Sequence, residues 1–273
     1  MKKKVALLLA LVLAFGLTGC GAKEETVDVA ADGEAKTFTV GFDAEFPPYG
    51  YMDDNGEYVG FDLDLAQEVC NRRGWTLVKQ PIDWDAKDME LSSGNIDCIW
   101  NGFTINGRED DYTWSFPYVD NSQVFVVAAD AGIATKADLA GKTVGVQKDS
   151  SALAALEDAE NQENLDLAAS FADLVQYADY NTGFMDLEAG AIDALAIDIG
   201  VANYQLGARE GEYVILEETL SSEQYGIGFL LGNDELKNQV EETLNEMVAD
   251  GTFMEIAEKY SDFGLVESVC LGK

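Results

Sequence analysis

The chain has no histidine among its 273 residues, and it has only four cysteines. Histidine is the commonest metal ligand and the usual general base of serine and cysteine hydrolases. Its absence therefore excludes those catalytic arrangements and weighs against a metal site. The cysteine spacing matches no zinc-binding pattern, and no pair of carboxylates stands out as an acid and a base. We expect a protein that is not an enzyme and that holds no metal or cofactor.

Positive charge is scarce as well. Lysine and arginine together number 17 against 51 aspartates and glutamates, which gives a net charge of −34. Such a surface repels phosphate groups, so nucleic acid and anionic lipid are excluded as binding partners. We interpret most of the acidic residues as solvated surface rather than as sites.

No apolar run is long enough to span a membrane. The longest, Val5–Leu17, has about 13 residues, whereas a spanning helix needs about 20. Lys2–Lys4 precede this run and Leu17-Thr18-Gly19-Cys20 follows it, which is the pattern of an export signal. The last four residues resemble the lipobox of bacterial lipoproteins. That resemblance implies a signal peptide over residues 1–20, a lipid on Cys20 and anchoring to the outside of the bacterial cell membrane.

The alternative for the N-terminus is a soluble secreted protein that is cleaved elsewhere. Gly21–Lys36 is polar and acidic, and it predicts a flexible tether. Three cysteines remain beyond Cys20, at Cys70, Cys98 and Cys270. An odd number outside the cell leaves one thiol unpaired unless it bonds to another chain. We expect buried, unreactive thiols, and a Cys70–Cys98 disulfide stays open as an alternative.

Short β-rich runs alternate with helical ones, which predicts an α/β fold. Expected strands are Phe38–Asp43, Ile96–Trp100, Gln123–Ala128, Lys142–Gln147, Ala191–Asp198 and Tyr225–Leu231. Expected helices run from Phe61 to a stop at Gly74, over Ser150–Glu160, over Ile199–Gly207, and from Leu236 to Gly251. Asp54-Asn55-Gly56 predicts a hairpin turn, because Asn-Gly tolerates positive φ.

Five segments carry a resemblance to one family. In order along the chain they are GFDAEFPPYGY (Gly41–Tyr51), GFDLDLA (Gly60–Ala66), NGFTINGR (Asn101–Arg108), VGVQKDSSA (Val144–Ala152) and ALAID (Ala194–Asp198). In order and spacing they resemble the polar-amino-acid solute-binding proteins of ABC importers, the family 3 extracellular solute-binding proteins. The resemblance covers about Thr37 to Tyr260. Each motif is weak alone, and the five in order are specific.

The resemblance implies a type II periplasmic-binding-protein-like fold, in which two α/β lobes close over the ligand. Lobe 1 would comprise residues 37–127 and 224–273, and lobe 2 residues 128–223. Two strand crossovers, near Val126–Ala129 and Ser222–Gly226, would join the lobes. The implied partners are an amino acid ligand and a membrane permease with its cytoplasmic ATPase, and the protein itself would be a monomer.

The resemblance also implies roles for residues in NGFTINGR. Arg108 matches the arginine that binds the ligand α-carboxylate, for which a bidentate guanidinium is well suited. Thr104 and the Gly102 carbonyl would contact the same zwitterion. The turn before Arg108 is one residue shorter than usual in the family, and we expect Gly107 to absorb the tighter backbone. The alternative is a surface arginine that pairs with neighbouring acidic residues, Glu109 or Asp110.

Two residues of the second lobe would complete the clamp. Ser151 matches a hydroxyl that reaches the ligand carboxylate, and Asp198 matches the carboxylate that takes the ligand ammonium. Each could instead cap the helix that follows it. For Ser151 the two roles are compatible.

Phe46 and Trp84 match aromatic walls around the ligand side chain. Asp43 matches a position that meets polar or cationic ligand tails in some relatives, so a polar or basic amino acid is favoured. Asp43 could equally hold the Phe46 loop together. The expected function is that of a receptor that delivers an amino acid to an importer. The alternatives are an enzyme similar to cyclohexadienyl or arogenate dehydratases on the same scaffold, and a sensory ligand-binding module.

Overall fold

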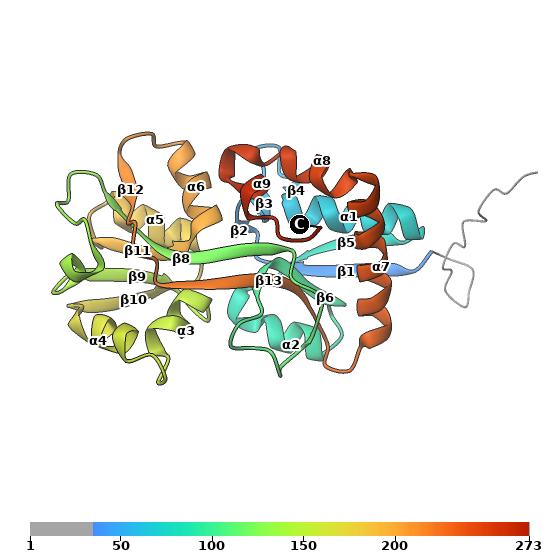
Figure 1. Ribbon diagram of the computed structural model, residues 1–273, viewed down its shortest axis with the longest axis horizontal. Helices are drawn as coiled ribbons and strands as arrows, with labels where there is room; N and C mark the ends of the chain where they lie inside the picture. The colour runs from blue at the N-terminus through green and yellow to red at the C-terminus, as the bar shows by residue number, and fades with distance from the viewer. Residues whose placement is uncertain (1–34, 273) are drawn as a thin grey trace, which may run out of the picture.

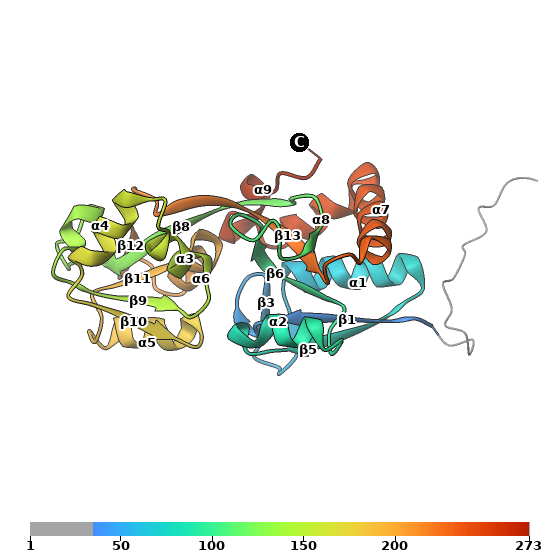
Figure 2. The same ribbon diagram turned by 90° about the horizontal axis from the view of Figure 1, so that it is seen from below.

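A computed structural model describes residues 35–272 of the chain. The predicted signal peptide, Cys20 and most of the predicted tether lie outside the described residues. Two groups of helices and strands lie side by side, and two long strands, β8 and β13, run through both (Figures 1 and 2). The chain therefore forms two lobes joined by a pair of strands, as the resemblance implies.

The strands and helices alternate along most of the chain. The strands are β1 (Thr37–Phe42), β2 (Glu45–Phe46), β3 (Gly50–Met52), β4 (Tyr58–Val59), β5 (Thr76–Pro81), β6 (Cys98–Thr104), β7 (Thr113–Trp114), β8 (Val119–Ala128), β9 (Thr143–Gln147), β10 (Asp173–Tyr177), β11 (Ala194–Asp198), β12 (Tyr213–Ile215) and β13 (Ser221–Phe229). The α-helices are α1 (Phe61–Arg73), α2 (Lys87–Ser92), α3 (Ser151–Glu157), α4 (Gln162–Ser170), α5 (Tyr180–Glu188), α6 (Ile199–Gly207), α7 (Asp234–Asp250), α8 (Thr252–Glu258) and α9 (Leu265–Ser268). Three short 3₁₀ turns cover Trp84–Ala86, Lys136–Leu139 and Ser261–Phe263.

One sheet continues from lobe to lobe. Its strand order is β10-β9-β11-β8-β13-β6-β1-β5, with β12 on β8 and β7 on β13, while β2, β3 and β4 form a separate small sheet. In the first lobe β1 lies between β5 and β6 and is parallel to both. In the second lobe β9 is parallel to β10 and β11. Strands β6 and β11 are buried along their whole length, as expected for strands covered on both faces.

Helix α1 illustrates how local sequence sets an element. Acidic Asp62 and Asp64 lie in its first turn and basic Arg72 and Arg73 in its last, an arrangement that complements the helix dipole. Gly74 follows with φ of 67° and ends the helix in the left-handed conformation that glycine adopts without strain. This end is where the sequence predicts it.

The crossover strands pair with each other over a short antiparallel stretch. Its register runs from Ser221 opposite Gln123 to Tyr225 opposite Val119. Beyond Gln123, β8 pairs with β11 and β12 of the second lobe. β8 therefore begins before the predicted strand at Gln123–Ala128, because the residues at 120–122 are polar and hide its first half in the sequence.

No helix within residues 35–272 is long and apolar enough to cross a membrane. Cys70 and Cys98 are buried and form no disulfide with each other. Burial raises the pKa of both Cys70 and Cys98 above the usual range. Both thiols therefore stay protonated and unreactive at neutral pH.

Candidate functional site

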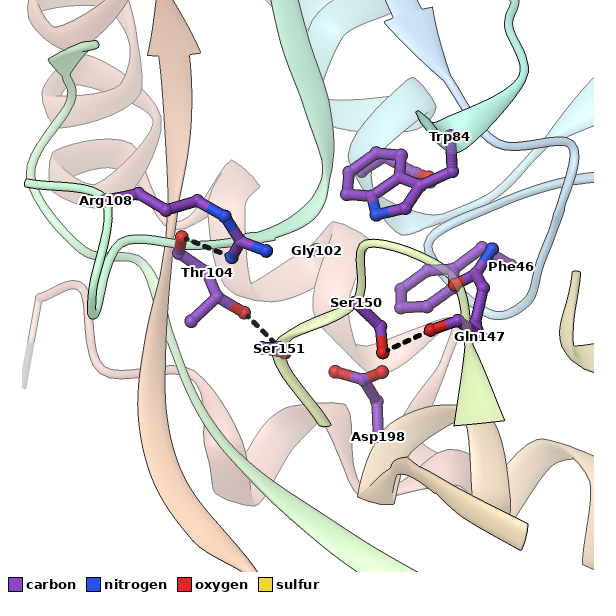
Figure 3. Close-up of a pocket in the computed structure, with 10 residues that line it drawn as sticks. Phe46, Trp84, Gly102, Thr104, Arg108, Gln147, Ser150, Ser151 and Asp198 are labelled. Atoms are coloured by element: carbon purple, nitrogen blue, oxygen red, sulfur yellow. Dashed lines mark hydrogen bonds between the residues drawn. The ribbon is translucent and has the colours of Figure 1, made fainter. Parts of the chain in front are cut away.

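A small pocket lies between residues of the two lobes. Its lining residues are Phe46, Trp84, Asn101, Gly102, Thr104, Arg108, Gln147, Ser150, Ser151 and Asp198 (Figure 3). Seven of the eight residues predicted to bind ligand are among them, and the eighth, Asp43, is not. The sequence reasoning missed Asn101, Gln147 and Ser150 as lining residues, although all three lie inside the segments that carry the resemblance.

Arg108 extends from a tight turn into the pocket (Figure 3). Its backbone N–H donates to Ile105 O at 2.9 Å, and Gly107 has φ of 80°, a conformation that glycine adopts without strain. The guanidinium donates to Thr104 O at 3.4 Å and, across the lobes, to Asp149 O at 3.2 Å. It forms no ion pair within residues 35–272. The guanidinium is thus available to bind an anion.

Gly102 occupies a position that no other residue fits. Its φ is 55°, and a Cβ atom there would lie 2.8 Å from Phe46 Cε1 and 3.0 Å from Tyr225 Cε2. The Gly102 N–H donates to Asp62 Oδ2 at 2.6 Å, which fixes the backbone from the first turn of α1. Bare backbone therefore forms this part of the pocket wall.

The two serines at the start of α3 have different hydrogen-bonding roles. Ser150 caps the helix, because its Oγ accepts a hydrogen bond from Leu153 N at 3.2 Å. The Ser151 hydroxyl is not used for capping. It lies 3.2 Å from Thr104 Oγ1 of the first lobe and accepts a hydrogen bond from Gln123 Nε2 at 2.9 Å. Ser151 and Thr104 thus meet across the pocket (Figure 3).

Asp198 ends β11 and is 3% exposed. It stands at the N-cap of α6, but its side chain makes no capping hydrogen bond. Its Oδ1 instead accepts from Gln123 Nε2 at 2.6 Å, from Asn121 Nδ2 at 2.9 Å and from the Tyr225 hydroxyl, and its Oδ2 accepts from Tyr180 at 3.1 Å. Burial, together with the nearby charge of Glu223, raises the pKa of Asp198 to about 7.

Glu223 is a second buried carboxylate in this region that sequence reasoning missed. It lies on β13 and is 6% exposed. Its Oε1 accepts from Asn121 and Gln123 at 2.7 Å each, from Thr104 at 3.0 Å and from Ser151 at 3.2 Å. No motif marks this residue, because only the pairing of the crossover strands brings it beside Asp198.

Aromatic rings form the opposite end of the pocket (Figure 3). Phe46 is 6% exposed and packs against the rings of Tyr49 and Tyr180, with centroids 5.6 Å and 5.9 Å away. Trp84 packs edge-on against Phe103 at 5.4 Å. The pocket therefore has a polar end and an apolar, aromatic end.

Asp43 lies behind the pocket rather than in its lining. Its Oδ1 accepts from Glu45 N at 2.8 Å, and its Oδ2 accepts from Gln147 Nε2 of the second lobe at 2.7 Å. Burial raises the pKa of Asp43 to about 6. Asp43 thus contacts the loop before Phe46 and two residues of the pocket lining, Gln147 through its carboxylate and Asn101 through its backbone N–H.

Contacts between the lobes surround the pocket. Lys87 of α2 forms an ion pair with Asp149, and Lys148 lies 3.7 Å from Asp85. Together with the contacts of Arg108 and Thr104 described above, these pairs hold the two lobes in a closed arrangement.

The sequence and the fold are similar to those of known proteins. Residues 38–264 match the sequence profile of the bacterial extracellular solute-binding proteins, family 3. The histidine-binding periplasmic protein of Salmonella typhimurium is 30% identical over 272 residues, which cover 96% of this chain and 98% of that protein. The L-cystine-binding protein TcyJ of Escherichia coli K12 is 30% identical over 230 residues, 83% of each chain.

A solved structure is also similar to this one. It is the substrate-binding protein of an ABC uptake transporter from Streptococcus pneumoniae with bound histidine. The TM-score is 0.78 at 36% identity, and the match covers 82% of this chain and 92% of that one. Similarity at this level extends over both lobes and the strands that join them.

Proposed function

Because the chain belongs to the bacterial extracellular solute-binding proteins of family 3, we propose that it captures a free amino acid between its lobes and delivers it to the membrane permease of an ABC importer. One observation carries this proposal. The cationic Arg108 and the carboxylate of Asp198 line the same pocket from different lobes. The pocket thus presents a positive charge for the carboxylate of an α-amino acid and a negative charge for its ammonium.

Each part of the ligand has a proposed partner. Arg108 binds the α-carboxylate through its planar pair of N–H donors, and the Ser151 hydroxyl adds a hydrogen bond from the second lobe. Asp198 accepts from the α-ammonium, and the Gly102 carbonyl and Thr104 contact the same zwitterion. The side chain of the ligand extends between Phe46 and Trp84.

A polar or basic side chain suits this pocket better than an acidic one. Asp43 and Gln147 close the end beyond the aromatic rings, and their hydrogen bond of 2.7 Å can open to admit a ligand donor. Relatives of this chain are named for histidine, for cystine and for lysine, arginine and ornithine. These names all support an amino acid as the ligand, but they differ in the side chain that the ligand carries.

Capture would proceed by closure of the lobes. The ligand binds first to one lobe, and contacts from the other lobe then stabilise the closed form. An affinity near the micromolar range, about −8 kcal/mol, is expected for such a receptor. A lipid on Cys20 would keep the monomeric protein at the outer face of the cell membrane, beside a permease whose cytoplasmic ATPase supplies the energy.

Isothermal calorimetry against twenty amino acids tests the proposal. At least one should bind, and Arg108→Ala should weaken that binding by about 100-fold or more, because a charged partner in the closed pocket is lost. Arg209→Ala is the matched control, since Arg209 pairs with Glu188 on the surface of the second lobe. Absence of heat with every amino acid would refute the proposal, and turnover of prephenate or arogenate would favour an enzyme instead.

A further inference from the structure

The carboxylates of Asp198 and Glu223 share the same two donors. Gln123 Nε2 lies 2.6 Å from Asp198 Oδ1 and 2.7 Å from Glu223 Oε1. Asn121 Nδ2 lies 2.9 Å and 2.7 Å from the same two oxygens. Asp198 Oδ1 and Glu223 Oε1 therefore both lie within hydrogen-bond distance of the same two nitrogen atoms. One small cationic group can likewise contact both carboxylates.

This cluster contains more acceptors than donors. Asn121 Oδ1 and Gln123 Oε1 are buried without a hydrogen-bond partner, and the two residues are 4% and 0% exposed. Every hydrogen bond that Glu223 accepts within residues 35–272 ends on Oε1, so Oε2 has no donor there. No lysine or arginine in that range forms an ion pair with either carboxylate.

Two buried carboxylates without a cation are unfavourable, because neither charge is compensated in a medium of low dielectric constant. Unpartnered amide oxygens add a further cost of desolvation. Tyr180 and Tyr225 donate hydroxyl groups to Asp198 and bring no positive charge. A donor-rich cation is the group that this cluster lacks.

The cluster opens onto the proposed ligand site. Asp198 lines the pocket, and two hydroxyls that bond to Glu223, those of Thr104 and Ser151, line it as well. These hydroxyls belong to different lobes and separate when the lobes open, which exposes Glu223 to an entering ligand.

We propose that Glu223 is a further ligand-binding residue, and that it forms with Asp198 a receptor of two carboxylates for the ammonium group of the ligand. This inference rests on the proposed function and deepens it. An ammonium carries three N–H donors, which suffice for both carboxylates and one of the unpartnered amide oxygens. The site therefore demands a primary amine on the α-carbon. It rejects the deamino acid, in which hydrogen replaces that ammonium.

A thermodynamic cycle between residue and ligand tests the inference. The probes are the tightest-binding member of a panel of twenty amino acids plus L-cystine, and the deamino acid of that member. Glu223→Gln keeps the shape and removes the charge. In this variant the preference for the amino acid over its deamino acid should fall by about tenfold or more. The matched control, Glu217→Gln, changes an exposed glutamate and should leave the preference unchanged.

The outcomes separate the two proposals. If the wild-type protein binds no member of the panel, the proposed function fails. If it binds and Glu223→Gln weakens binding of the amino acid and of the deamino acid equally, Glu223 only supports the fold and the inference is overturned.

A thermal shift with sodium chloride that choline chloride does not give, and that Glu223→Gln abolishes, would assign the cluster to a metal cation instead. If Glu223→Gln does not fold, Glu223→Asp retains the charge on a shorter side chain and should lower the preference partly, whereas an unchanged preference would overturn the inference.

Discussion

Lys87 of the first lobe forms an ion pair with Asp149 of the second, and its side chain is only 2% exposed in the closed arrangement. The neighbouring pair between Lys148 and Asp85 also bridges the lobes, but both side chains are 53% exposed and their charged atoms are 3.7 Å apart. Asp149 is 51% exposed, so only the Lys87 side of the first pair is buried, whereas water screens both sides of the second pair. The two bridges should thus differ in their effect on closure.

Lys87→Ala should shift the ligand-free protein towards the open form and weaken amino acid binding by about tenfold, because closure would lose the contact between the buried Lys87 side chain and Asp149 of the other lobe. Small-angle scattering should detect a larger radius of gyration, and calorimetry the loss of affinity. Lys148→Ala is the control, and its effect should be within about threefold. Equal effects of the two substitutions would show that burial of Lys87 is irrelevant to closure.

Gly102→Ala should impair both stability and binding. The added methyl group would lie 2.8 Å from Phe46 Cε1, at a backbone φ of 55° that alanine rarely adopts. We expect a loss of about 2–4 kcal/mol in the free energy of unfolding, measured by urea denaturation. Gly107→Ala separates backbone strain from crowding, because Gly107 has φ of 80° but no atom within 4 Å of the place that a Cβ atom would take. Its cost should be about 1 kcal/mol.

Binding should depend on pH through Asp198. Burial and the charge of Glu223 raise the pKa of Asp198 to about 7, and the ionised form is the one that attracts an ammonium. The groups that face Asp198 are Glu223 on β13, the hydroxyls of Tyr180 and Tyr225, and two neutral amides. Affinity should therefore rise from pH 5 to about pH 7 and level off above it. Calorimetry at pH 6 in buffers of different ionisation enthalpy should show proton release, and a flat profile would contradict this assignment.

Stability should depend on pH through Asp62. Burial raises the pKa of Asp62 to about 7 in the folded protein from an ordinary value of 3.8. Between these values the unfolded chain releases the proton while the folded chain keeps it, so the free energy of unfolding falls as pH rises from about 4 to 7. Relative to Asp62→Asn, the wild-type protein should lose about 3 kcal/mol over that range. Urea denaturation at pH 4.5 and 7.5 measures the difference, and parallel profiles of the two proteins would disprove it.

Elements with strong local signals could be predicted from the sequence. The helix expected at Ile199–Gly207 has the bounds of α6, and the helix expected to stop at Gly74 does so. The strand expected at Gln123–Ala128 begins instead at Val119, because its first half contains a run of consecutive polar residues with no apolar periodicity to mark it. The local sequence pattern thus predicts the ends of helices well and the ends of a strand between lobes poorly.

The residues in and around the pocket also differ in how well the sequence predicts them. Arg108 and Asp198 could be predicted as lining residues because each is the last residue of a segment that resembles the family, NGFTINGR and ALAID respectively. Glu223 could not, since it lies in SSEQYG, which resembles an ordinary surface strand. Its burial arises from pairing opposite Asn121, a contact between residues about one hundred positions apart in the chain. No local pattern encodes such a contact.

Glu223, Asn121 and Gln123 all lie on the paired stretch of the two strands that join the lobes. When two bodies rotate about a common axis, a point near the axis hardly travels, whereas a point at the rim sweeps the longest arc. If the lobes close about these strands, the carboxylate of Glu223 should move little, and Lys87 and Asp149, which lie outside the strands, should move further. The proposed recognition of the ligand ammonium would then take place close to the strands that join the lobes, and the ion pair of the buried Lys87, which stabilises closure, would form farther from them.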